Sequence, residues 1–191
     1  PENVITSVLL KGFLPDIFKA YLDLRGSFRN QLKSCTSEAR LLAYAFFISI
    51  TLFLERLPER VTNHYPDSTS EILLYYIGID LFTSVFFVPI FIYFLSAVIH
   101  LACLPFSGNA SFFEARLAFF WTIIVASPIL LTTAALQGIF LNLWFSQFIQ
   151  HASALTYAWI FSSILCTAEG FSSNLFLFFC LLFGYLFLSY A

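Results

Sequence analysis

Long apolar segments separated by short polar ones run through most of this chain. Beyond residue 37 each apolar stretch is long enough, or nearly so, to cross the roughly 30 Å hydrocarbon core of a bilayer as a helix. The shorter polar stretches between them are typical of the turns that connect spans. The pattern predicts an all-α, polytopic membrane protein with about five transmembrane helices. The predicted spans cover residues 39–56, 80–104, 115–147, 152–168 and 174–190, with a link at 147–153.

Two of the apolar segments are interrupted by proline. Pro89 predicts a kink in the second span, and we expect residues 71–79 ahead of that span to form an interfacial lead-in. Pro128 predicts a second kink within residues 117–148, a segment too long for one straight span. The sequence leaves two solutions open for this segment: one long kinked helix, or one span followed by an interfacial return.

The first 37 residues form a different kind of segment, in which apolar side chains recur every three to five positions. Charged residues lie between them, and the opposite face is net basic, with Lys11, Lys19, Arg25 and Arg29 as its interfacial candidates. This amphipathic pattern predicts an interfacial N-terminal helix in the headgroup region. Packing on the protein's own cytoplasmic side explains the pattern equally well.

Composition and charge narrow the class of protein further. Only 10% of residues are charged and the mean hydropathy is +0.86, whereas soluble domains have about a quarter of their residues charged. The net charge of −2 gives no basic surface for nucleic acid, so no nucleic-acid partner is predicted. Most of the nine Lys and Arg residues precede or open the first span, which predicts a cytoplasmic N-terminus. Five spans then place the C-terminus on the opposite side.

Four ionisable residues at span ends are the candidates for a polar site. In the predicted topology His100, Glu114, Arg116 and Glu169 all fall near the cytoplasmic face, where they can form a network between spans. Ionisable groups within a bilayer are functional candidates because burying a charge at mid-depth costs at least about 2.5 kcal/mol. The alternative is that they are interfacial anchors and one ion pair that fixes the geometry of a helical hairpin.

No pattern in the chain indicates catalysis or metal binding. The sequence has no HExxH or GxSxG motif, and its four cysteines form no CxxC pair. We therefore expect no catalytic residue, no metal site and no cofactor, and the protein is not predicted to be an enzyme.

The order of these segments resembles a known family. The first span reads EARLLAYAFFISITLFLERLPE, the second ends in a small polar turn, and SFFEARLAFFWTIIVASPILL follows before a fourth span closing on CTAEGF. This is similar to the bacterial branch of the Yip family, the Ypt/Rab-interacting five-span membrane proteins. The resemblance covers about residue 38 to the end and implies an integral membrane protein, with the bacterial inner membrane as its location. The chain has no counterpart of the DLYGP-like signature of eukaryotic members, so Rab-type GTPase binding does not carry over.

Two functions from different classes fit these patterns. The first is a non-catalytic, Yip-like scaffold or accessory subunit that assists organisation or assembly of membrane components or of a larger membrane complex. Its expected partners are membrane lipids and other integral membrane proteins. The alternative is a small-solute or lipid carrier that uses the cytoplasmic-side polar cluster. A carrier predicts a cavity that reaches Pro128, whereas a scaffold predicts a closed bundle.

Overall fold

The computed structural model describes residues 14–34, 37–60, 70–139 and 143–190. Within these ranges the chain forms seven α-helices and one short 3-10 helix, and it has no strand, so the all-α fold is confirmed. The elements are α2 (Leu14–Leu22), α3 (Leu24–Ser34), α4 (Glu38–Glu59), α5 (Ser70–Cys103), η3 (Leu104–Phe106), α6 (Phe112–Ile139), α7 (Leu143–Glu169) and α8 (Asn174–Tyr190).

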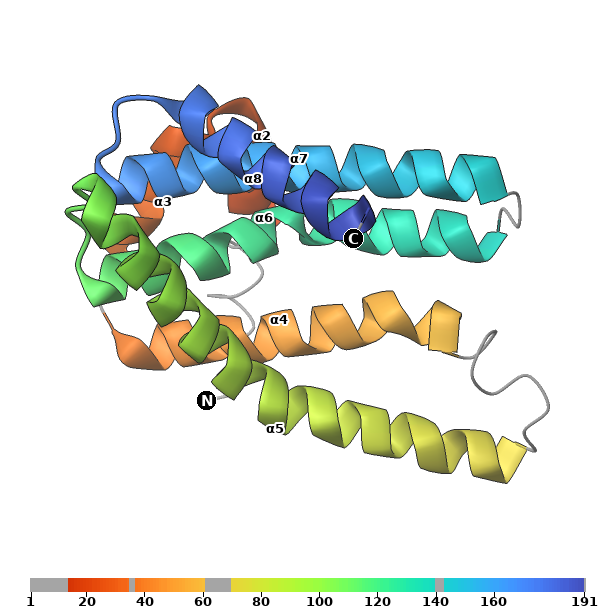
Figure 1. Cartoon of the computed structure of the whole chain (residues 1–191). Helices are drawn as coiled ribbons and strands as arrows, with labels where there is room; N and C mark the ends of the chain where they lie inside the picture. The colour runs from red at the N-terminus through yellow and green to blue at the C-terminus, as the bar shows by residue number, and fades with distance from the viewer. Residues whose placement is uncertain (1–13, 35–36, 61–69, 140–142, 191) are drawn as a thin grey trace.

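The long helices form one bundle, with α6 at its centre (Figure 1). Residues 117–127 of α6 are buried without interruption, which is the pattern of a helix covered on all sides. Figure 1 shows the α5–α6 and α7–α8 links at one end of the bundle and the α6–α7 link at the other. The C-terminal helix α8 crosses the bundle obliquely and packs mainly on α7.

Among the residues that the structure describes, three helical stretches are long and apolar enough to cross a membrane, and they cover Glu38–Pro58, Glu71–Phe106 and Phe112–Gln137. This supports the prediction of a membrane protein. The apolar part of α8, Asn174–Leu186, is shorter than these three. The count of five spans stays a prediction.

Two expected boundaries differ from the structure. No separate lead-in precedes the second span, because α5 is helical from Ser70 onwards. The link expected at 147–153 is wrong: α6 ends at Ile139, and α7 already begins at Leu143. The polar residues that suggested a link belong to an exposed face of α7, since a helix accepts Gln, Ser and His at solvent- or headgroup-facing positions. Residues 117–148 are therefore neither one long kinked helix nor one span with an interfacial return. They contain most of α6 and the first residues of α7.

Pro128 lies within α6, where it deprives the Ile124 carbonyl of its usual backbone donor. The Ser127 hydroxyl replaces that donor and bonds the Ile124 carbonyl at 2.7 Å. Neighbouring hydroxyls commonly satisfy carbonyls freed by proline in membrane helices. Pro89 lies within α5, which bends along its length in Figure 1, as expected for a helix that contains proline.

The N-terminal helices α2 and α3 pack on the long helices, chiefly α6 and α7. Ile17 and Phe28 are buried in the common core, and the Tyr21 hydroxyl donates a 2.5 Å hydrogen bond to the Val125 carbonyl near the middle of α6. This contact favours packing on the protein itself over a helix that lies only in headgroups. Of the predicted interfacial residues, Lys19, Arg25 and Arg29 are exposed, and Lys11 lies outside the described residues.

Candidate functional site

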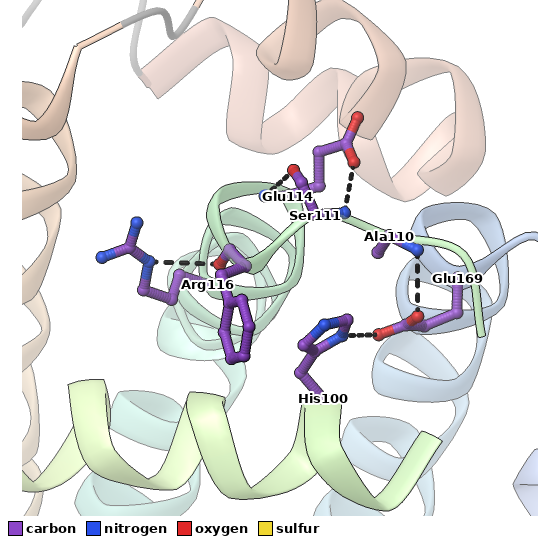
Figure 2. A network of polar contacts seen from close by, with 7 residues as sticks. His100, Ala110, Ser111, Glu114, Arg116 and Glu169 are labelled. Atoms are coloured by element: carbon purple, nitrogen blue, oxygen red, sulfur yellow. Dashed lines mark hydrogen bonds and ion pairs between the residues drawn. The ribbon is translucent and has the colours of Figure 1, made fainter. Parts of the chain in front are cut away.

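A buried histidine–glutamate pair joins the C-terminal ends of α5 and α7 (Figure 2). His100 Nδ1 lies 2.8 Å from Glu169 Oε1, and the two side chains are 4% and 0% exposed. If the carboxylate is ionised, His100 carries its proton on Nδ1 and donates it to Glu169. Burying a carboxylate is costly unless it is paired and hydrogen-bonded, and this pair meets that requirement in part.

The remaining requirement is met by the loop between α5 and α6, which wraps around Glu169. The Ala110 N–H donates to Glu169 Oε2 at 3.2 Å, and the Asn109 N–H donates to the Glu169 backbone carbonyl at 3.1 Å. At Gly108 a Cβ atom would lie 2.6 Å from Oε2 of Glu169 and 3.0 Å from the Cys103 carbonyl oxygen. The loop therefore approaches the carboxylate as closely as it does because residue 108 has no side chain.

Two local features of the chain present these groups. Ser107 follows η3 with φ of 67°, which turns the chain back towards α7. Gly170 follows α7 with φ of 75°, a left-handed conformation that favours glycine and ends the helix directly after Glu169. Beyond it, the Phe171 N–H bonds the Cys166 carbonyl at 3.1 Å, and the Cys166 thiol donates to the Phe171 carbonyl. Glu169 is thus held in the last turn of α7.

The other two candidate residues belong to separate contacts. Glu114 Oε2 accepts the Ser111 N–H at 2.7 Å, and the Ser111 hydroxyl accepts the Glu114 N–H at 3.2 Å, which is a capping box at the start of α6. Arg116 Nη2 donates to Glu38 Oε1 at 2.6 Å and so links α6 to α4. Figure 2 shows both side chains pointing away from the His100–Glu169 pair. The structure therefore brings together two of the four predicted site residues.

A second polar network, which the sequence did not indicate, joins α2 and α3 to α4. Buried Gln31 donates to Asp16 at 3.2 Å and accepts a 3.0 Å bond from the Tyr44 hydroxyl. Arg40 donates to the Tyr44 hydroxyl and to the Ser34 carbonyl, which fastens the N-terminal helices to the first long helix. Glutamine and tyrosine are uncharged, so neither residue stands out in the sequence as a site candidate. Only their burial and hydrogen bonding in the fold reveal the network.

The chemistry open to the His100–Glu169 pair is limited. Within the described ranges no three His, Cys, Asp or Glu side chains gather where they could hold a metal ion. Cys103, one turn after His100, is buried, but no hydrogen bond joins its thiol to His100. The pair also touches an aromatic ring, because the His100 and Phe112 rings meet edge to face at 4.6 Å. These contacts hold together α5, α7 and the loop between α5 and α6. The arrangement is typical of a structural polar contact between helices.

Comparison with known proteins gives no further guide, since no family model, no curated protein and no solved structure matches this chain. The fold and its polar contacts define a helical protein with membrane-compatible helices. The resemblance to the Yip family stays a prediction.

Proposed function

We propose that the protein is a non-catalytic integral membrane protein, a Yip-like scaffold or accessory subunit that assists assembly or organisation of other membrane components. One observation carries the proposal. Three pairs of ionisable residues near the span ends make contacts that fasten the protein's own helices: His100 with Glu169, Arg116 with Glu38, and Arg60 with Asp80 at 3.1 Å. None of these groups is left facing a site where a substrate could react.

The surface of the longest helix supports the same proposal. Only 22% of the most apolar window of α5 is buried within the chain. Its outer face carries large apolar side chains that are more than half exposed, among them Leu74, Phe82 and Phe86. In a membrane such a face contacts lipid or another membrane helix, and aromatic side chains dominate contact energies in interfaces between proteins.

The proposed topology has five spans. It adds α7, with 27 residues, and α8, with 17, to the three helices of clear spanning length. With the N-terminus in the cytoplasm, the α5–α6 and α7–α8 links face the cytoplasm, and the chain reaches residue 191 on the opposite side. The bacterial inner membrane is the proposed location.

The test is gentle detergent extraction from the native membrane, followed by mass spectrometry of what remains bound in stoichiometric amount. An accessory subunit is expected to come with a defined larger complex. A matched sample of a variant with two outer-face substitutions on α5, Phe82→Ala and Phe86→Ala, is expected to lose partner proteins without unfolding, since both side chains are exposed and neither lines the large cavity. Recovery of the wild-type chain with no protein partner would refute the accessory role.

A second candidate, a small-solute or lipid carrier, is favoured by one observation. The bundle is closed around α6 but open between α5 and α7–α8, where a cavity of about 1230 Å³ reaches Ile123 and Leu130, on either side of Pro128 in the chain. The closed bundle expected of a scaffold is thus found on only part of the molecule. The lining is dominated by Phe, Leu, Ile and Ala side chains, which suits an acyl chain and not a polar solute. Transfer of labelled lipid between vesicles by the purified protein would support this candidate over the first.

A further inference from the structure

The cavity between α5 and α8 has a shape and chemistry that no contact described so far explains. Five helices, α4 to α8, contribute to its lining, and its volume of about 1230 Å³ is above the 300–1,000 Å³ of common small-molecule sites. A second cavity of about 660 Å³ lies between α7, α8 and the end of α5. The two share Phe161, Cys180 and Leu181 as lining residues, so the space between α7 and α8 continues from one to the other.

The length of the larger cavity matches one leaflet of a bilayer. On α7 its lining residues run from Gln150 to Phe161, which is about 16 Å of helix at roughly 1.5 Å per residue. Half of a hydrocarbon core of about 30 Å is about 15 Å. A lipid acyl chain that starts at the level of Gln150 would therefore reach Phe161 within its own leaflet.

Polar groups line the cavity near the end of α4. Arg56 and Gln150 are exposed, and among the described residues neither side chain has a hydrogen-bond or ion-pair partner. An arginine attracts a phosphate through charge and paired donors, and the amide of a glutamine can donate to the same phosphate. Arg56 and Gln150 therefore complement the phosphate of a lipid headgroup.

We propose that this cavity is a binding site for one phospholipid, whose acyl chain lies between α5 and α8 and whose phosphate contacts Arg56 and Gln150. The apolar wall supplies the contacts of the chain, and the polar end sets the depth and orientation of the lipid. The proposal rests on the membrane insertion proposed above, and it holds for an accessory subunit and for a carrier alike.

Two glycines offer a matched pair of variants. A Cβ atom at Gly184, which lines the cavity, or at Gly78, which does not, would meet no atom within 4 Å. Gly184→Leu therefore places a side chain in the cavity without a clash, and Gly78→Leu places the same side chain on an open helix surface. Arg56→Gln tests the headgroup contact, and Arg29→Gln is its control, since Arg29 is an exposed arginine on α3 that does not line the cavity.

The experiment is native mass spectrometry of the full chain, released from mixed micelles that hold equal amounts of phosphatidylethanolamine and of a diacylglycerol with identical acyl chains, which lacks the phosphate. We expect one phosphatidylethanolamine per wild-type protein and about tenfold lower occupancy for Gly184→Leu, the effect of losing a few apolar contacts. Gly78→Leu and Arg29→Gln are expected to match the wild type. Arg56→Gln is expected to lower occupancy about fivefold, as for one basic residue near a membrane surface.

Equal lipid occupancy in Gly184→Leu and Gly78→Leu would overturn the site. Equal retention of the two lipids by the wild type would overturn the phosphate contact. Thermal unfolding of each variant in the same detergent shows whether it is folded, and Arg56→Gln tests the site independently of cavity filling. Because partner recovery is measured separately, loss of the lipid site with the complex intact would refute this inference alone.

Discussion

The substitution Gly108→Ala tests the close approach of the α5–α6 loop to the buried carboxylate. The added Cβ would lie 2.6 Å from Oε2 of Glu169, closer than Cβ atoms in folded proteins come to a non-bonded oxygen, and 3.0 Å from the backbone oxygen of Cys103. Backbone strain plays no part, since residue 108 does not have a positive φ. Either the carboxylate retreats or the loop moves, and both break the bond from the Ala110 N–H to Glu169.

The magnitude follows from that lost bond. A hydrogen bond to a charged group contributes about 1.5–3 kcal/mol, and replacing glycine by alanine returns about 0.4–1 kcal/mol through the unfolded state. We expect Gly108→Ala to lower the free energy of unfolding by about 1–2 kcal/mol. The matched variant Gly78→Ala lies inside α5 with open space around its Cβ, and it is expected to gain roughly 0.5–1 kcal/mol. Between the two variants the melting temperatures should differ by roughly 5–10 °C.

The buried thiols provide the assay. Cys103 and Cys166 are buried and Cys180 is exposed, so a thiol-reactive dye reports unfolding in a Cys35→Ser, Cys180→Ser background. A Glu169→Ala background removes the oxygen that the new Cβ would meet, so the penalty of Gly108→Ala should shrink there. Equal melting temperatures for Gly108→Ala and Gly78→Ala, or an unchanged penalty in the Glu169→Ala background, would refute the reasoning.

Three further predictions concern single contacts, each measured by thermal unfolding in detergent. His100→Ala leaves the buried Glu169 carboxyl group without its side-chain hydrogen-bond partner and should cost about 1–3 kcal/mol; an unchanged stability would contradict a tight pair. Ser127→Ala removes the donor to the Ile124 carbonyl and should cost about 1–2 kcal/mol, and an unchanged stability would contradict a stabilising role of this bond. Burial raises the pKa of Tyr21 above its usual value of 10.0. The contribution of Tyr21 to the free energy of unfolding is therefore complete below pH 10, and it is lost as the pH rises through the higher folded-state pKa. Tyr21→Phe should abolish that alkaline loss, and an identical pH profile in both proteins would exclude Tyr21 as its source.

Much of the architecture is readable from the sequence because hydrophobic periodicity depends on local residues. The helices α4, α5 and α6 follow from long apolar runs, and the bend of α5 from Pro89. The sequence pattern predicts the α6–α7 boundary too late in the chain, because polar residues such as Gln147 suit a turn as well as a helix surface. In the structure Gln147 lies on an exposed surface of α7. Polarity alone does not separate a turn from a polar helix face.

The candidate site was predictable only as a set of charged residues at one depth. That His100 meets Glu169 while Arg116 meets Glu38 depends on how helices rotate about their axes when they pack, which no single helix specifies. The role of Gly108 depends on a loop closing over α7, a contact between residues far apart in sequence. Uncharged groups such as Gln31 and Tyr44 carry no signal before their burial is known.

The accessory function and the lipid site both require five spans with a cytoplasmic N-terminus, and labelling of single cysteines tests that arrangement directly. All native cysteines are first replaced by serine, and a tag is added after residue 191. Single cysteines are then introduced in place of Asn109, Gln147 or Ser172, which are exposed and lie near the ends of the long helices. A membrane-impermeant thiol reagent on intact cells should label position 147 and reach the tag, and should label 109 and 172 only after the cytoplasmic side is opened. Labelling of 172 from outside, or a tag on the same side as position 172, would contradict the account.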